Sequence, residues 1–205
     1  LRLSSIEATE VTRELIAAMA EHLDKVCPHL HICLQSGSDR ILAKMNRRWG
    51  AQRFLDRCQL VRESLENPAL TTDVIVGFPG ETTADFQATL DVCRQSLFSK
   101  IHIFPFSPRR TTPAAVMPEQ VHSDVKNGRV HELTALEKEL RRDYFTQLLG
   151  RPLRVLVEGN AEENVDRRHG TSCRYAPVEL AASLGAPGEF VDVVPQHLSD
   201  DLTLS

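Results

Sequence analysis

Residues 71–82 read TTDVIVGFPGET, and this stretch decides the fold. Its first half is a short apolar run rich in β-branched residues, which predicts a buried parallel strand. The Gly77–Gly80 segment predicts a turn, and Thr82 followed by Asp85 predicts a helix N-cap of the capping-box type. The next apolar residues repeat at helical spacing and predict one buried face: Phe86, Leu90, Cys93 and Leu97. The stretch therefore predicts a strand, a glycine loop and a helix.

The position of this loop favours ligand binding. In parallel α/β folds, ligands bind at the carboxyl ends of the strands. Gly77 and Gly80 would let a ligand approach the backbone closely, and we expect the Glu81 carboxylate to be free on the loop. A glycine loop is a weak motif by itself, so a simple tight turn stays the alternative.

The rest of residues 1–149 alternates between strand and helix patterns. Strands are predicted at 1–6, 30–35 and 99–106, in addition to 71–77. Helices are predicted after Thr9, after Ser38 or Asp39, and over 51–65. This alternation predicts a parallel α/β sheet, either open or part of a TIM-like barrel. A polar helix should follow over 119–149, and Asn127-Gly128 should break it or weaken it by about 1 kcal/mol.

Residues 150–205 have a different texture. Short strand patterns at 153–158, 173–180 and 189–194 are separated by Gly, Asn, Asp and Pro, which predicts a small antiparallel β-barrel. We therefore divide the chain into an α/β part, residues 1–149, and a β-barrel, residues 150–205. The chain begins within a strand-like segment, Leu1–Ile6, so we expect it to be a fragment of a longer protein.

Composition limits the function classes. Hydrophobic residues make up 41% and charged residues 25% of the chain, and no apolar run is long enough to span a membrane. The five cysteines are scattered, which indicates reduced thiols and a cytoplasmic location, and no pair has the spacing of a zinc or iron–sulfur motif. His29, His31 and His102 alternate with apolar residues on strands, and we expect them to be hydrogen-bonded barrel histidines rather than metal ligands.

One local cluster of positive charge points to RNA. Residues 1–150 carry 19 basic and 19 acidic side chains, so the bulk charge does not indicate nucleic-acid binding. Arg47, Arg48 and Arg53 surround Trp49, however, and this mixture suits phosphate contacts and base stacking. A solvated helix face is the alternative.

Four loop motifs together resemble the radical S-adenosylmethionine (SAM) methylthiotransferases. They are RLSSIE (2–7), LQSGSD (34–39), TDVIVGFPGET (72–82) and FPFSPR (104–109). CPHLH (27–31), MNRRW (45–49) and TPAA (112–115) support the resemblance, which is closest to the branch that acts on threonylcarbamoyladenosine in tRNA. Gly170-Thr171, Tyr175 and Val178 resemble the terminal RNA-binding TRAM β-barrel of the family.

The resemblance implies a partial radical SAM barrel that contains only the later strands, followed by a TRAM-like barrel. It implies SAM and two 4Fe-4S clusters in the intact enzyme, with the cluster cysteines outside this chain, and the anticodon region of tRNA as substrate. The missing amino-terminal half, or a chain supplying it, would be a partner. The residues implied to bind the cofactor are Ser5, Glu7, Gln35, Ser36, Gly77, Phe78, Pro79, Gly80, Ser107 and Arg109. The residues implied to bind RNA are Arg47, Arg48, Trp49, Arg53, Arg174 and Tyr175.

The resemblance leaves alternatives open. The substrate could instead be isopentenyladenosine in tRNA or an aspartate of a ribosomal protein, and a non-catalytic RNA-binding remnant is an alternative of another class. Thr111 stands where the family has glycine, which puts the conformation of that loop in doubt. No catalytic residue is expected in this chain, and the fragment alone is expected to be inactive.

Overall fold

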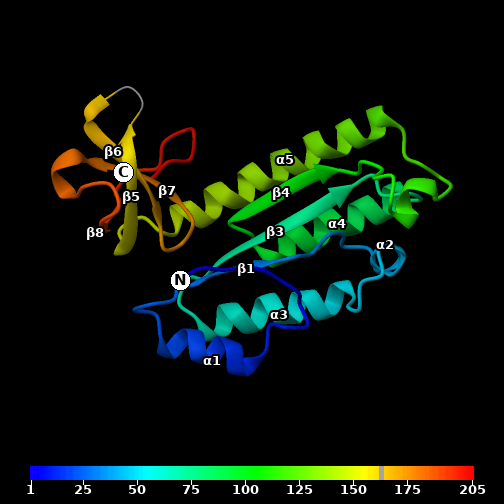
Figure 1. Cartoon of the computed structure of the whole chain (residues 1–205), viewed down its shortest axis with the longest axis horizontal. Helices are drawn as coiled ribbons and strands as arrows, with labels where there is room; N and C mark the ends of the chain where they lie inside the picture. Colours follow the sequence, from blue (N-terminus) through cyan, green and yellow to red (C-terminus); the bar gives the residue numbers. More distant parts are fainter. Residues whose placement is uncertain (162–163) are drawn as a thin grey trace.

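The computed structural model describes residues 1–161 and 164–205, and Figure 1 shows two β-sheets connected by a long helix. The first sheet is parallel, with the strand order β1-β2-β3-β4. Its strands are β1 (Leu3–Ile6), β2 (His29–Ile32), β3 (Ala69–Val76) and β4 (Lys100–Pro105). The helices that follow them are α1 (Arg13–Glu21), α2 (Asp39–Lys44), α3 (Ala51–Ser64), α4 (Thr83–Ser96) and α5 (Ser123–Thr146).

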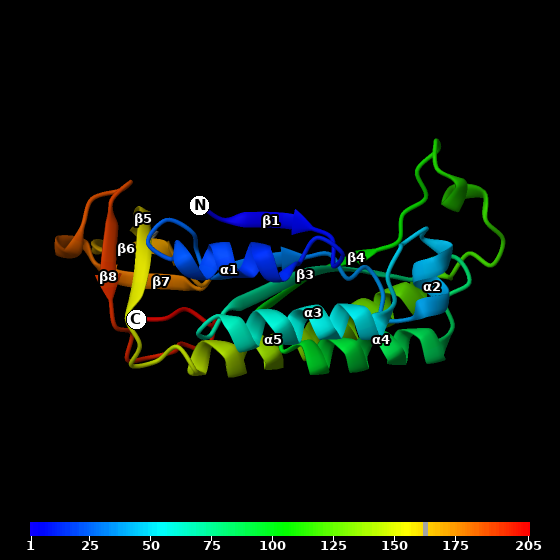
Figure 2. The ribbon, with the colours of Figure 1, turned by 90° about the horizontal axis from the view of Figure 1, so that it is seen from below.

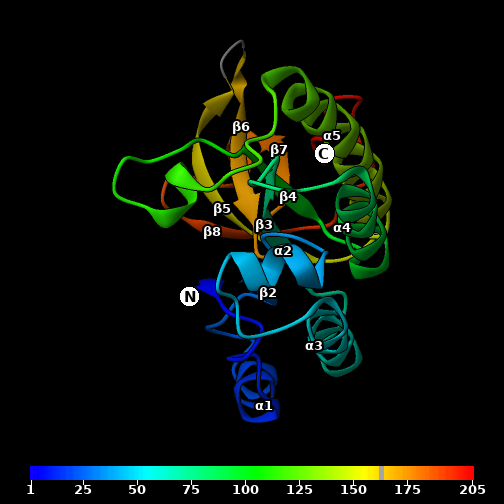
Figure 3. The ribbon, with the colours of Figure 1, turned by 90° about the vertical axis from the view of Figure 1, so that its right-hand side faces the viewer.

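The strand order and the helix positions are those of a barrel segment. Neighbouring strands follow each other in sequence, and Figures 2 and 3 show α3, α4 and α5 along one face of the sheet. A doubly wound sheet would carry helices on both faces. The predicted parallel α/β architecture is therefore confirmed, with an incomplete barrel as its form.

The two faces of the parallel sheet differ in chemistry. Leu30, Ile32 and Val74 are fully buried in the apolar core beneath the helices. The alternate residues of the same strands, such as His31 and Asp73, point to the inner face, because successive side chains of a strand point to opposite sides. The inner face is thus the polar one.

The second sheet is antiparallel, with the order β7-β6-β5-β8. Its strands are β5 (Leu153–Ala161), β6 (Asn164–Ser172), β7 (Pro177–Ala181) and β8 (Phe190–Val193). Short 3-10 helices lie at Pro113–Val116 and Ala182–Leu184. The antiparallel arrangement is as predicted, and its closure into a barrel stays a prediction.

Helix α5 contributes to both hydrophobic cores. Leu133 and Leu136 pack under the parallel sheet, whereas Tyr144 and Phe145 pack in the core of the antiparallel sheet. Within the described residues, no helix is both long and apolar enough to cross a lipid bilayer.

A second contact between the sheets involves two residues that were predicted to bind RNA. The Tyr175 ring lies 5.0 Å from the His29 ring, and the Arg2 guanidinium lies 4.9 Å from the centre of the Tyr175 ring. Arg174 Nη1 donates to the carbonyl oxygens of Glu66 and Asn67, at 2.6 and 2.8 Å. Both side chains therefore help to join the two sheets.

Several local predictions were wrong. Helix α1 is capped by Thr12 rather than Thr9, because the Thr12 hydroxyl accepts the Leu15 amide. Helix α5 begins at Ser123 and runs through Gly128, so the break predicted there as one of two outcomes is absent, because packing at Leu133 and beyond outweighs one unfavourable residue. The predicted weakening at Gly128 stays a prediction. Leu97 is exposed and ends α4 in the left-handed conformation instead of extending its buried face.

The strands of the antiparallel sheet also differ from the prediction. Residues 164–172 form a strand that the sequence did not indicate, and the predicted strand at 173–180 is replaced by 177–181. The cause is a turn at residues 173–175, where Tyr175 has a φ of 60° and its amide donates to the Ser172 carbonyl.

Candidate cofactor and substrate site

A cavity of about 500 Å³ lies beside the carboxyl ends of β3 and β4. It is lined by Gln35, Asp73, Ile75, Phe104, Pro105, Phe106, Ser107, Arg109, Thr112 and Ala114. A second cavity of about 400 Å³ shares Gln35, Ile75, Thr112 and Ala114 with the first and extends to Arg47 and Phe78. The lining combines apolar surface with a few polar groups, which is the usual composition of a small-molecule site.

Gln35 is placed in both cavities by the pairing of its backbone with β3. Its amide donates to the Asp73 carbonyl at 2.8 Å, and its carbonyl accepts the Ile75 amide at 2.9 Å. Its φ is 67°, a left-handed value that ends the strand direction at this point. Gln35 therefore lies at a strand end, as predicted, and lines both cavities.

The glycine loop has the conformation that its glycines permit. Gly77 and Gly80 have φ values of 75° and 79°, which residues with a side chain rarely adopt. A Cβ atom on Gly77 would collide with the Lys126 side chain, and one on Gly80 would collide with Lys44. Lysine side chains therefore fill the space beside both glycines: Lys126 lies beside Gly77, and Lys44 lies beside Gly80. Phe78 lines the smaller cavity and contacts the Phe106 ring edge to face, with centroids 5.2 Å apart.

The expectation that the Glu81 carboxylate is free was wrong. Its side chain is 1% exposed, and its Oε2 accepts from Arg129 Nη1 and from the Gly77 amide, both at 2.6 Å. Burial raises the pKa of Glu81, and the Gly77 amide and the Arg129 charge oppose that rise. The Arg129 guanidinium also lies 5.5 Å from the Phe86 ring centre. Glu81 thus anchors the glycine loop to α5.

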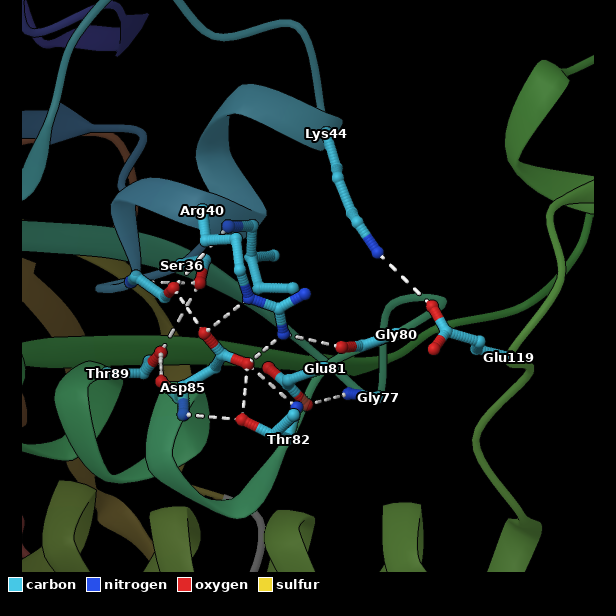
Figure 4. A network of polar contacts seen from close by, with 12 residues as sticks. Ser36, Arg40, Lys44, Gly77, Gly80, Glu81, Thr82, Asp85, Thr89 and Glu119 are labelled. Atoms are coloured by element: carbon cyan, nitrogen blue, oxygen red, sulfur yellow. Dashed lines mark hydrogen bonds and ion pairs between the residues drawn. The ribbon is translucent and has the colours of Figure 1, made fainter.

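Asp85 is the centre of a second polar network, which Figure 4 shows between α2 and α4. The capping box is confirmed, because Thr82 and Asp85 exchange side-chain and backbone hydrogen bonds. Asp85 also accepts from Ser38 at 2.6 Å and forms an ion pair with Arg40, whose Nη2 donates to the Gly80 carbonyl at 2.6 Å. The network fixes α2, the glycine loop and the start of α4 relative to one another.

We expect the folded chain to lose stability in acid, where Asp85 takes up a proton. Burial would raise its pKa, but the hydrogen bonds from Arg40, Ser38 and Thr82 outweigh burial and hold the pKa well below its ordinary value. The unfolded chain, with an ordinary aspartate pKa of about 4, therefore takes up the proton more readily. We expect the stabilisation to be complete above about pH 4 and to decline as the pH falls below that value.

Urea unfolding between pH 3 and pH 6 tests this expectation. The wild-type chain should lose stability on acidification more steeply than Asp85→Asn, which cannot change its charge. Parallel stability curves for the two proteins would contradict it.

The structure brings only some of the predicted cofactor residues together. Gln35, Phe78, Ser107 and Arg109 line the two cavities. Ser36 is fully buried and contacts Thr89, so its hydroxyl is used within the protein. The other predicted residues, Ser5, Glu7, Gly77, Pro79 and Gly80, are not lining residues of these cavities.

The predicted RNA-binding residues also separate into groups. Trp49 is 5% exposed, so its ring packs in the core and is not accessible for stacking on a base. Arg47 lies over that ring and pairs with Glu7 at 3.0 Å. Arg48 and Arg53 are exposed, so they are the members of the cluster that remain available to phosphate.

Thr111 lies in an exposed turn and is not among the residues with positive φ. The loop therefore accommodates threonine without left-handed strain. Sequence reasoning missed the roles of Arg40 and Arg129, since both lie on polar helix faces that resemble ordinary solvated surface. Asp85 lies 45 residues from Arg40, and Glu81 lies 48 residues from Arg129. A local pattern of apolar and charged residues cannot indicate partners so far away in the sequence.

The comparisons with known proteins give the family. Residues 4–93 match the model of the Radical SAM superfamily. The chain is 36% identical to the threonylcarbamoyladenosine tRNA methylthiotransferase MtaB of Bacillus subtilis, over 100% of this chain and 49% of that protein. It is 42% identical to the tRNA-2-methylthio-N(6)-dimethylallyladenosine synthase of Corynebacterium urealyticum, over 94% of this chain and 36% of that protein.

The chain belongs to the radical SAM methylthiotransferase family. It spans half or less of the length of these curated relatives. Among solved structures, coproporphyrinogen III oxidase (HemN) from Escherichia coli, described as a radical SAM enzyme, has a similar fold with a TM-score of 0.56. That similarity covers 68% of this chain and 32% of the oxidase chain at 14% sequence identity, so it supports the fold alone.

The family uses SAM and iron–sulfur clusters, and the residues present fit these groups unequally. The cavity beside β3 and β4 offers amide, hydroxyl and guanidinium groups from Gln35, Ser107 and Arg109, which suit the polar parts of SAM. The cysteines do not suit a cluster, since Cys58 and Cys93 are buried and no three cysteines of the described residues gather at one place. This chain therefore fits SAM in part and does not fit a cluster.

Proposed function

We propose that this chain is the carboxyl-terminal part of an enzyme that adds a methylthio group to C2 of threonylcarbamoyladenosine in tRNA, next to the anticodon. The observation that carries the proposal is the match to the threonylcarbamoyladenosine enzyme over the whole chain, both sheets included. SAM would supply the radical chemistry after reduction by a 4Fe-4S cluster, and a second cluster would carry sulfur. The cluster ligands would come from outside this chain.

The residues of this chain would bind and position the reactants. Gln35 and Ser107 would hydrogen-bond the hydroxyl and amino groups of a nucleoside, and Arg109 would pair with a carboxylate. Both SAM and threonylcarbamoyladenosine carry such a carboxylate. Phe104 and Ile75 would exclude water from the cavity. In this proposal tRNA is the macromolecular partner and the cytoplasm is the place of action.

A second substrate has a specific observation in its favour. Relatives named as dimethylallyladenosine synthases are 38–44% identical over 84–98% of this chain. Their substrate has an apolar group in place of the threonyl carboxylate, so Arg109 would have no anionic partner on it.

Nucleoside analysis tests the proposal and separates these substrates. The longer reading frame that contains this chain is expressed in a bacterium without methylthiotransferases of its own, and digested tRNA is analysed by mass spectrometry. We expect 2-methylthio-threonylcarbamoyladenosine. If the isopentenyl product appears alone, the second substrate is established. If both products are absent, the RNA-binding remnant is favoured.

The chain alone is expected not to cleave SAM. After anaerobic iron–sulfur reconstitution of the 205-residue chain, 5′-deoxyadenosine should stay at the level of the protein-free control. Appreciable formation of 5′-deoxyadenosine would show that the chain holds a functional cluster by itself.

If the exposed Arg48 and Arg53 contact tRNA phosphates, they should contribute to the salt dependence of tRNA binding. Replacing Arg48 and Arg53 together by alanine should weaken binding and lower the slope of log K against log salt by about one for each lost phosphate contact. Arg94→Ala is the matched control, since Arg94 is also exposed but pairs with Asp91 on α4. An unchanged slope in the double variant would assign Arg48 and Arg53 to a solvated face.

A further inference from the structure

Three different metal-ligating side chains meet on the inner face of the parallel sheet. His31 lies on β2, Cys33 is the first residue after that strand, and Asp73 lies on β3. Their ligand atoms, an imidazole nitrogen, a sulfur and a carboxylate oxygen, all lie within 4.8 Å of one another. The pairing of His31 with Thr71 places Cys33 beside Asp73 two residues further on. We propose that these three side chains form a mononuclear site for a divalent transition-metal ion, with Zn²⁺ as the best match.

The geometry of the pair formed by His31 and Asp73 is already suitable. Nε2 of His31 lies 3.3 Å from Oδ2 of Asp73. Two ligand atoms at about 2.0–2.1 Å from a tetrahedral zinc ion lie about 3.3–3.4 Å apart. In such a site the sulfur lies about 3.6 Å from each of them, and the Cys33 sulfur is already within 4.8 Å of both.

The surroundings orient the histidine for this role. The other ring nitrogen of His31, Nδ1, lies 3.1 Å from the Thr71 hydroxyl, which also contacts Nε2 of His29 at 3.0 Å. The hydroxyl can accept the Nδ1 proton of His31 while it donates to His29. Nε2 of His31 is then left as the ligand atom, as in metal sites where an outer hydrogen bond fixes the ring.

The kinds of ligand select the metal. Nitrogen and sulfur donors suit zinc and its transition-metal neighbours, whereas calcium and magnesium need oxygen ligands. A single thiolate is too few for an iron–sulfur cluster. Asp73 also lines the 500 Å³ cavity, so a fourth coordination position can open toward it. The His102 ring stands on β4 opposite Asp73, with its centroid 5.7 Å from that of His31.

Cobalt(II) is the probe that tests the site. The untagged chain is stripped with a chelator, kept reduced with a phosphine, and titrated with cobalt(II) chloride under argon. We expect one cobalt ion per chain, with tetrahedral bands in the visible and a thiolate-to-cobalt charge-transfer band in the near ultraviolet. Zinc chloride should then displace cobalt, since zinc binds such ligands more tightly.

Matched variants locate the ion. Cys33→Ser should abolish the charge-transfer band, and Asp73→Asn and His31→Gln should each weaken cobalt binding by about tenfold or more. Cys173→Ser, a partly buried cysteine outside the group, should leave the spectrum unchanged. Circular dichroism checks that each variant is folded, and Asp73→Asn keeps the side-chain shape if another variant unfolds.

Two results would overturn the proposal. One is the absence of binding at one ion per chain. The other is binding in which Cys33→Ser retains the wild-type spectrum and affinity, since Cys33 would then not be a ligand of the ion. The test does not depend on methylthio transfer, so its outcome is separate from that of the proposed function.

Discussion

Replacing Arg129 by methionine is expected to lower the free energy of unfolding by about 3–5 kcal/mol, because it leaves a buried carboxylate without its cation. Glu81 is 1% exposed, and its Oε1 already has no partner. After the substitution only the Gly77 amide would remain to stabilise the charge. The glycine loop would also lose its connection to α5.

The loss should depend on pH in a defined direction. Burial already raises the pKa of Glu81 in the wild-type chain, and removing the Arg129 charge, which opposes that rise, should raise it further. The folded variant then binds the proton more readily than the unfolded chain, so its stability is greatest below the unfolded pKa and falls as the pH rises. The variant should therefore be closer to wild type at pH 5 than at pH 8.

Urea unfolding followed by circular dichroism measures this effect. Adding Glu81→Gln to Arg129→Met removes the unpaired charge and should restore part of the stability. Arg94→Met on the exposed side of α4 is the control and should change stability by no more than about 0.5 kcal/mol. A loss below about 1 kcal/mol in Arg129→Met would mean that the pair does not hold the loop.

The second large effect is expected at Gly37, between β2 and α2. A Cβ atom there would lie 2.5 Å from Thr89 Cα and 2.6 Å from the Ala88 carbonyl oxygen, both in the backbone of α4. The Gly37 amide also donates to the Thr89 hydroxyl at 2.9 Å, which holds the two segments in contact. Gly37→Ala should therefore destabilise the chain by about 2–3 kcal/mol.

The same substitution at Gly128 should have the opposite sign. Gly128 lies inside α5, and a Cβ atom there would have no neighbour within 4 Å. Alanine should stabilise the helix by about 0.5–1 kcal/mol. Thermal or urea unfolding of both variants measures the difference, and equal effects at the two sites would contradict the close approach of residues 36–38 to α4.

Much of the fold was predictable because its signals are local. The apolar run before Gly77 predicted β3, and Thr82 with Asp85 predicted the start of α4, because a cap depends on residues three positions apart. The glycines predicted the loop, and their φ values confirm why glycine is needed. The turn at Tyr175 was missed, because a left-handed tyrosine has no clear sequence signature.

The site was predictable only in outline. Gln35 and Ser107 follow strands, so their presence at the strand ends could be inferred. Whether a polar side chain faces a cavity or another residue depends on distant partners. Ser36 and Gln35 are neighbours in sequence, yet Ser36 contacts Thr89 and Gln35 lines the cavities.

The sequence by itself determined the order of strands and helices in residues 1–149, the glycine loop with its capped helix, and the family. These follow from the spacing of apolar residues, the backbone preferences of single residues and short motifs, all of which can be recognised in the sequence alone. Only the tertiary structure decided which charged side chains are free to contact a ligand and which are paired within the protein. Glu81 is neutralised by Arg129, which lies 48 residues away, and Trp49 is buried beside Arg47. The physical reason is that burial and ion pairing arise between segments brought together by folding, whereas sequence patterns record only neighbours.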